Sequence, residues 1–219
     1  MKVVRIWFRK TGAARYISHL DLNRCMSRAM HKANIPLWYT QGFNPHAFLT
    51  FALPLPLGIR SERECMDLKL DDDVISREEM ISRLNTALPK DLAVFDVTEP
   101  VRKPGQIATA SYRILLEPEN TSADELCSQI RDFFQAPEIV VPKHTKSGII
   151  DFDLKPYLNQ TSVSVKGDGV EMETLLPAGS NGNVNPMLIL DALKKYLNLE
   201  PYADIERTGL YDNTGKIFE

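Results

Sequence analysis

The chain is organised around residues 14–58, which read ARYISHLDLNRCMSRAMHKANIPLWYTQGFNPHAFLTFALPLPLG. Ser18 followed by Asp21 is a helix start signal, because the hydroxyl caps a free backbone amide and the carboxylate complements the positive end of the helix. The helix is predicted to run to about Asn34, where Asn-Ile-Pro stops it. Apolar residues recur at the helical period and form its buried stripe: Leu22, Met26, Ala29, Met30 and Ala33. The other faces carry the basic residues Arg24, Arg28, His31 and Lys32.

Strand and helix signals on both sides of this segment predict an α+β fold. Residues 2–9 alternate as a strand with Val4, Ile6 and Phe8 on a buried face. Ser76 and Glu79 form a capping box that opens a second helix, which Pro89 ends. Further strands are predicted at 47–52, 64–70 and 92–97. The resulting order, βαββαβ, is the ferredoxin-like arrangement.

The second half of the chain is predicted to follow a related order. Its helices are predicted at about 123–135 and 186–197, and Gly167-Asp168-Gly169 is a hairpin signal between two of its strands. Strands are predicted at 111–117, 138–141, 148–154, 162–166, 170–176 and 202–211. We therefore predict two ferredoxin-like halves with antiparallel sheets: a basic N-terminal domain at 1–99, a linker at 100–109 and a second α+β domain at 110–219.

Composition narrows the class of protein. The chain has 219 residues, of which 43% are hydrophobic, enough for one large core or two small ones. No window reaches the roughly 18 apolar residues of a membrane span, and no signal-peptide core is present, so we predict a cytoplasmic protein with no membrane partner. Cys25, Cys65 and Cys127 are too widely spaced for a disulfide framework, a zinc knuckle or a radical-SAM cluster. The chain is therefore not itself a radical-SAM enzyme.

Charge divides unevenly along the chain. Residues 1–65 hold ten Lys and Arg against three Asp and Glu, a net +7, whereas the whole chain has a net charge of −3. Such asymmetry favours a polyanion-facing N-terminal part, and RNA is the predicted ligand. The predicted RNA- or anion-binding residues are Arg5, Trp7, Arg9, Arg15, Arg24, Arg28 and Lys32, with Lys143 and Lys146 as a second patch. The alternatives are that the cations lie on a solvated face and that Trp7 is covered by the second half.

Several motifs carry a resemblance to a known family. These are R-Y-I-S-H-L-D at Arg15–Asp21, Y-T-Q-G-F-N-P-H at Tyr39–His46, L-P-L-G at Leu55–Gly58, and Ser61 with Glu64. Together they resemble the domain of unknown function associated with radical-SAM proteins. The resemblance implies a partner, since in that family the domain is fused to a radical-SAM enzyme or encoded beside one. S-H-L-D opening a basic helix is also similar, more distantly, to ferredoxin-like CRISPR-repeat-processing endoribonucleases.

Two histidines are the candidate catalytic residues. His19 lies at a helix N-terminus, where the dipole favours a neutral imidazole suited to a general base. His46 lies in a Gly/Pro loop and could supply the acid of a metal-independent ribonuclease. The alternative is that both hydrogen-bond loop backbone. No metal-ligand spacing or phosphate loop occurs, so we predict neither a metal nor a cofactor.

Three functions therefore stay open, with an accessory binding protein favoured over an enzyme. The first is a radical-SAM-associated protein that binds or positions RNA, such as tRNA or rRNA. The second is the ribonuclease that uses His19 and His46. The third is a scaffold that docks the radical-SAM enzyme through Trp38, Tyr39, Phe43 and Phe48. The sequence predicts neither the RNA target nor the oligomeric state.

Overall fold

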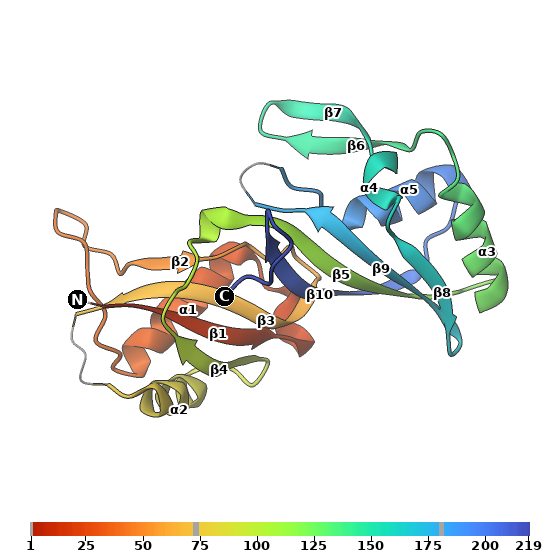
Figure 1. Ribbon diagram of the computed structural model, residues 1–219. Helices are drawn as coiled ribbons and strands as arrows, with labels where there is room; N and C mark the ends of the chain where they lie inside the picture. The colour runs from red at the N-terminus through yellow and green to blue at the C-terminus, as the bar shows by residue number, and fades with distance from the viewer. Residues whose placement is uncertain (1, 72–74, 180–181) are drawn as a thin grey trace. The chain divides into compact units, whose positions relative to one another are not determined.

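The computed structural model describes residues 2–71, 75–179 and 182–219 (Figure 1). It forms two compact units: unit 1 comprises the chain up to Ile107 together with Arg207–Glu219, and unit 2 comprises Ala108–Glu206. The predicted division placed residues 207–219 in the second domain, whereas they group with unit 1. β10 (Tyr202–Asp212) is the neighbour of β3 (Arg60–Leu70), and within unit 1 Arg207 binds Glu64 and Arg102 binds Asp212.

Unit 1 is an antiparallel sheet covered on one face by two helices. Its sheet order is β4-β1-β3, with β2 paired to β3 and the last part of β10 also next to β3. This is the ferredoxin-like arrangement, so the predicted fold of this half is confirmed. The elements are β1 (Lys2–Lys10), α1 (His19–Lys32), β2 (Leu49–Phe51), β3 (Arg60–Leu70), α2 (Arg77–Ala87) and β4 (Leu92–Thr98), with a short 3-10 helix η1 (Gly12–Tyr16) before α1.

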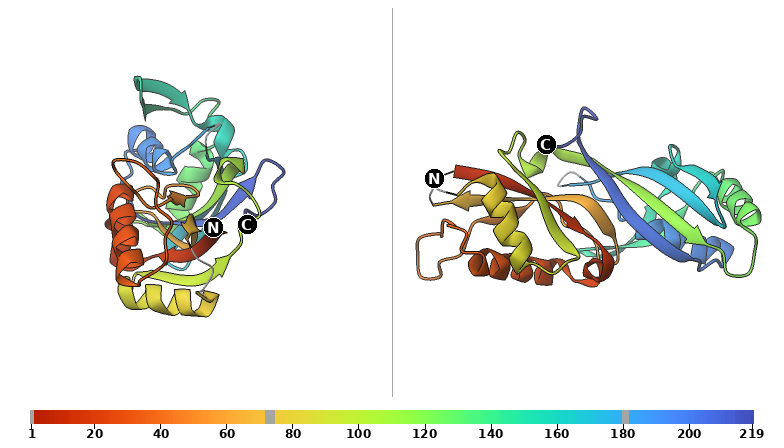
Figure 2. Two further views of the ribbon diagram at one scale, coloured as in Figure 1. Left: turned by 90° about the vertical axis from the view of Figure 1, so that its left-hand side faces the viewer. Right: turned by 90° about the horizontal axis from the view of Figure 1, so that it is seen from below.

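The helix α1 forms where its start and stop signals predict. Ser18 is the N-cap, and its hydroxyl accepts a hydrogen bond from the backbone amide of Asp21 at 3.1 Å. The chain leaves the helix at Asn34, which adopts a left-handed φ of 51°. The buried side chains of α1 are Leu22, Met26, Ala29 and Met30, and they join a core that also contains Met80 and Leu84 of α2. Both helices therefore cover the same face of the sheet (Figure 2).

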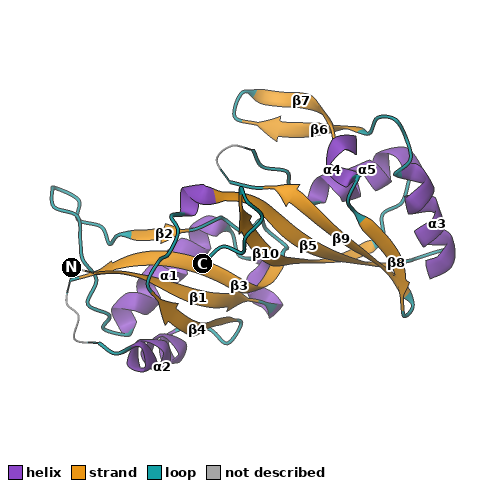
Figure 3. Cartoon of the chain, viewed as in Figure 1, coloured by secondary structure: helices purple, strands orange, loops and turns teal. Residues whose placement is uncertain are grey.

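Unit 2 repeats this order with one insertion. Its strands follow the order β10-β5-β9-β8, and β5–β9 and β8–β9 pair antiparallel. The hairpin β6–β7 is a separate two-stranded sheet inserted between α3 and β8 (Figure 3). The elements are β5 (Ile107–Glu117), α3 (Ala123–Phe133), β6 (Val140–Thr145), β7 (Gly148–Asp153), α4 (Lys155–Leu158), β8 (Ser162–Lys166), β9 (Gly169–Pro177), α5 (Met187–Leu197) and β10 (Tyr202–Asp212).

The predicted linker is shorter in the structure. Within it, Pro104–Gln106 form the 3-10 helix η2, and β5 begins at Ile107 because Thr109 and Ala110 already pair with β9.

None of the described helices combines the length and hydropathy needed to cross a membrane.

Candidate nucleic-acid interface

The outward surface of α1 is cationic. Arg24, Arg28, His31 and Lys32 are exposed on it, and we call these four residues the α1 outer face. Arg24 makes an ion pair with Asp21, with Nη1 and Oδ1 3.4 Å apart. Arg28 and Lys32 have no carboxylate within ion-pair distance in the described part of the chain. Two full positive charges are therefore available to an external anion.

A shallow depression lies beside these cations. Its volume is about 370 Å³, and Ala29 of α1 and Ala87 of α2 contribute apolar surface to it. Its rim carries Arg24, Arg28 and Lys32, opposed by the carboxylate of Asp21. The half-buried thiol of Cys25 also lines it, and burial raises the pKa of Cys25 although the nearby Arg28 guanidinium acts in the opposite direction. The depression is thus a concave surface with a positive rim.

Two predicted RNA-binding residues of β1 lie in the interior instead. Arg5 is fully buried, and its Nε and Nη2 donate to the Asp67 carboxylate at 2.6 and 2.9 Å. Trp7 is also buried, under the Arg63 guanidinium, and its indole N–H donates to Thr98 at 2.9 Å. The side chains of Arg5 and Trp7 are therefore covered, and neither residue lies on an RNA-facing surface.

Two further predicted cations have other partners. Arg9 is exposed, and its Nε lies 3.1 Å from a Glu62 carboxylate oxygen. Arg15 is half-buried, and its Nε donates to the carbonyl of Gly58 at 2.7 Å. Gly58 has a φ of 83°, and its amide returns a hydrogen bond to the Arg15 carbonyl. Arg15 therefore fixes the end of the loop at residues 53–58, which we call the proline-rich loop.

A buried polar cluster stands beneath that loop, and the sequence reasoning missed it. Arg207 donates to Glu64 at 2.9 Å and to the carbonyl of Leu53 at 2.8 Å. Lys10 is fully buried and donates to the carbonyl of Ile17 at 3.1 Å. Burial lowers the pKa of the Lys10 ammonium, although the Glu64 carboxylate opposes this effect. One available signal was that Lys10 follows Phe8 at strand spacing, on the buried side of β1.

The two candidate catalytic histidines have separate partners. The His19 ring packs edge-on against Phe51, with the ring centroids 5.0 Å apart. Burial is the main cause that lowers the pKa of His19, and the Lys10 cation adds to it. His19 Nδ1 is buried and has no hydrogen-bond partner among the described residues. His46 is exposed, and its Nδ1 lies 3.0 Å from the Thr40 hydroxyl. No contact between the two imidazoles occurs within the described ranges.

The predicted aromatic docking residues divide into two pairs. Trp38 lies under the Lys69 ammonium, and the Tyr39 hydroxyl is 2.8 Å from His31 Nε2, so both are tied to the body of unit 1. Phe43 is fully exposed, and Phe48 is 40% exposed. Phe43 and Phe48 are thus more exposed than Trp38 and Tyr39, which are half-buried.

The second predicted basic patch lies in unit 2, on the β6–β7 hairpin and its turn. Lys143 is half-buried, donates to the Asn183 carbonyl at 2.7 Å and stacks over Phe152. Lys146 is exposed in the turn. These two cations belong to unit 2, whereas the α1 outer face belongs to unit 1.

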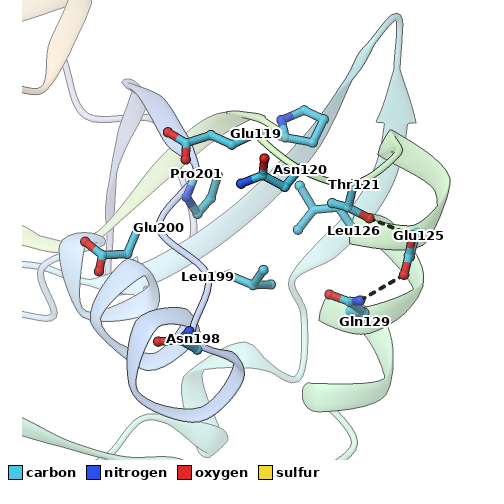
Figure 4. Close-up of a pocket in the computed structure, with 11 residues that line it drawn as sticks. Glu119, Asn120, Thr121, Glu125, Leu126, Gln129, Asn198, Leu199, Glu200 and Pro201 are labelled. Carbon is cyan, nitrogen blue, oxygen red and sulfur yellow. Dashed lines mark hydrogen bonds between the residues drawn. The ribbon is translucent and has the colours of Figure 1, made fainter.

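Another hollow in unit 2 has the opposite charge. It is lined by Glu119, Glu125 and Glu200 together with neutral polar side chains such as Asn120 and Gln129 (Figure 4). Glu125 accepts a hydrogen bond from Thr121 at 2.7 Å. Three carboxylates disfavour a phosphate here. In the described part of the chain, no group of three His, Cys, Asp or Glu residues is placed to hold a metal ion.

Comparisons with known proteins identify a family but assign no activity. A family model described as "Uncharacterized protein conserved in bacteria" (DUF2344) matches residues 3–186. No curated protein matches the chain. The chain is similar to "Crystal Structure of a Cbf5-Nop10-Gar1 Complex" at 12% identity and a TM-score of 0.47, covering 94% of this chain and 48% of that one. It is also similar to an unknown protein from Galdieria sulphuraria at 11% identity and a TM-score of 0.26, covering 94% of this chain and 98% of that one.

The chain thus spans about half the length of the first of these structures. Similarity at this level is too low to transfer a function.

Proposed function

Because the chain belongs to this family of uncharacterised bacterial proteins, we propose its function from the site itself: it is an accessory protein that binds RNA through the α1 outer face. The observation that carries the proposal is the pair Arg28 and Lys32, exposed cations without carboxylate partners among the described residues, on the rim of a depression. Cations that are not neutralised internally can bind phosphates and release their counterions.

Binding is favoured over cleavage for a geometric reason. A metal-independent ribonuclease needs an acid and a base on the same phosphodiester. His19 packs on Phe51 and His46 bonds Thr40, so the two imidazoles belong to different local environments. The proposal therefore assigns them no catalytic role.

The proposed partner is a radical-SAM enzyme, to which this protein would present or position the RNA. Support for this partner comes from the motifs at Arg15–Asp21 and Tyr39–His46, which resemble the radical-SAM-associated domain. The test is co-purification of the full chain with the radical-SAM enzyme encoded nearby, with and without ribonuclease treatment. Recovery that ribonuclease abolishes supports an RNA-bridged complex, and failure to recover the enzyme under either condition contradicts this part of the proposal.

RNA binding itself is tested by titrating a fluorescent RNA at several salt concentrations. The double variant Arg28→Ala/Lys32→Ala should weaken binding and flatten the log–log salt slope by about 0.7 for each lost phosphate contact. Lys166→Ala/Lys194→Ala is the matched control, because it removes the same charge from exposed lysines that already pair with Glu171 and Glu200. Absence of affinity at low salt, or an equal loss in the control, overturns the proposal.

A second readout uses the thiol beside the cations. Cys25 lines the depression and is half-buried, so bound RNA should slow its alkylation. Cys65 provides an internal control, because it is buried and burial raises its pKa to about 12. Alkylation of Cys25 at an unchanged rate under saturating RNA would place the RNA elsewhere on the molecule.

A further inference from the structure

An isolated aromatic ring stands at the tip of the loop that follows α1. Phe43 is fully exposed, and its neighbours Gln41, Gly42, Asn44, Pro45 and His46 are exposed as well. Figures 1 and 2 show this loop projecting beyond the end of α1. Such a ring offers a flat apolar surface, and covering it with a ligand is favourable because apolar area is removed from water.

The loop is joined to the α1 outer face. His31, one of the four residues of that face, contacts Tyr39 at the start of the loop, with Nε2 and the hydroxyl 2.8 Å apart. Phe43 is four residues beyond Tyr39, so the two Cα atoms lie within about 14 Å of each other even if the chain is extended. Lys32 is the next residue after His31 and ends the helix. The loop that carries Phe43 is thus tied to α1 through His31, so one extended nucleic-acid strand can contact both Phe43 and the cations of the α1 outer face.

We infer that the RNA is single-stranded where it meets this protein, with an unpaired base stacked on Phe43 while Arg28 and Lys32 bind the backbone phosphates. The inference rests on the proposed function and names the form of its ligand. Proteins that bind single strands combine a positive groove with aromatic platforms, because every base presents a π-face. In a continuous duplex the faces of the bases are already stacked, so a lone ring at a loop tip has no base to cover.

A protein partner fits the same ring less well. Large exposed apolar patches mark protein docking sites, whereas the sequence places Phe43 among polar loop residues that include Gln41 and Asn44. Trp38 and Tyr39, which would enlarge such a patch, are tied to Lys69 and His31. The exposed amide side chains of Gln41 and Asn44 instead suit hydrogen bonding to the edge of a base.

The experiment compares single- and double-stranded probes on the full chain. The probe is an oligoadenylate of about ten nucleotides, a length within the site sizes of single-strand binders, used alone or annealed to its complement. Phe43→Leu removes the π-face but keeps an apolar side chain, and Phe43→Tyr keeps the π-face. Tyr202→Leu is the control for loss of an exposed ring in unit 2.

The single strand should bind more tightly than the duplex, and Phe43→Leu should weaken only single-strand binding, by about fivefold to a hundredfold. Phe43→Tyr and Tyr202→Leu should leave it unchanged. Equal binding of both probes with no effect of Phe43→Leu overturns this inference while the proposed function stands. Absence of binding by either probe at low salt overturns the proposed function and this inference together. If Phe43→Leu reduces only co-purification with the radical-SAM enzyme, the ring docks protein and the inference is wrong.

Discussion

Unit 1 holds two groups of arginines with opposite environments. Arg24 and Arg28 are exposed on the α1 outer face, and Arg28 lacks a carboxylate partner in the described ranges. Arg5 and Arg207, which we call the interior arginines, are fully buried and each makes a two-pronged pair with a carboxylate, Asp67 or Glu64. Arginine content therefore does not measure the cationic surface, because a buried guanidinium is neutralised by its own protein.

The interior arginines also hold chain segments in place. Arg5 donates to the carbonyl of Arg102 at 2.7 Å and stacks over the buried ring of Phe218. Arg207 donates to the carbonyls of Leu53 and Pro54 in the proline-rich loop. The interior arginines thus connect β1 and β10 to loops whose backbones form no β-sheet hydrogen bonds of their own. Arg28 and Lys32 of the α1 outer face make no such connection among the described residues, so the two groups should respond differently to substitution.

The largest effect should come from an interior arginine. Arg207→Ala leaves Glu64 buried without its partner, and we expect a loss of about 3–5 kcal/mol in the free energy of unfolding. The measurement is chemical denaturation of the full chain. Replacing both partners, as Arg207→Met/Glu64→Leu, should cost less than the single change because neither member of the pair is then left buried without the other. A single variant as stable as the parent would contradict the assigned role of the pair.

A smaller effect is expected where α1 begins. Ser18→Ala removes the hydroxyl that caps the amide of Asp21, and caps of this kind contribute about 1 kcal/mol. Thermal unfolding measures the loss, and Ser18→Asp should restore most of it because aspartate is also a good N-cap. A loss for Ser18→Asp equal to that for Ser18→Ala would show that the cap is not what fixes the start of the helix.

Substitutions in the α1 outer face should change the stability of the protein very little. Arg28→Ala/Lys32→Ala should change the free energy of unfolding by no more than about 0.5 kcal/mol, since exposed side chains outside networks contribute little. The same denaturation series measures it beside Arg207→Ala. A loss approaching that of the interior arginine would mean that Arg28 and Lys32 are structural, and the two groups of arginines would then not differ in role.

The smallest expected effect is a change in how the free energy of unfolding depends on pH. Burial and Lys10 lower the pKa of His19 below its ordinary 6.5, so near that pH the unfolded chain binds more protons than the folded one. The contribution of neutral His19 is complete above pH 6.5 and is lost as the pH falls from there through the lowered pKa. Unfolding measured between neutral and mildly acid pH should show a shallower fall for His19→Gln than for the parent, with the exposed His46 replaced in a control variant. Identical slopes for His19→Gln and the parent would contradict this account.

The boundaries and the buried face of α1 could be predicted because residues close together in the sequence determine them. The cap at Ser18, the stop at Asn34 and the apolar stripe of α1 are each set by neighbouring residues, and the structure confirms them. The ferredoxin-like order of the first half followed from the same signals. The β6–β7 hairpin was predicted as two strands, but its separation from the main sheet was not, since strand propensity does not identify the pairing partner.

The candidate site was predictable only in part. Helical spacing alone predicted that three cations lie away from the buried face of α1: Arg24, Arg28 and Lys32. In the structure all three are exposed. Arg5 and Trp7 share a strand face that alternation cannot distinguish from an open one, and both proved buried. The partner of Arg5 lies 62 residues away, at Asp67, and that of Arg207 lies 143 residues away, at Glu64.

The amino-acid sequence by itself determined the helices, the strands and the cationic character of the first third of the chain, because these depend on side chains a few residues apart. Only the tertiary structure decided which cations bind carboxylates and which face solvent. The free energy of a charge depends on its burial and on its partner, and both are set by residues brought together from distant parts of the chain.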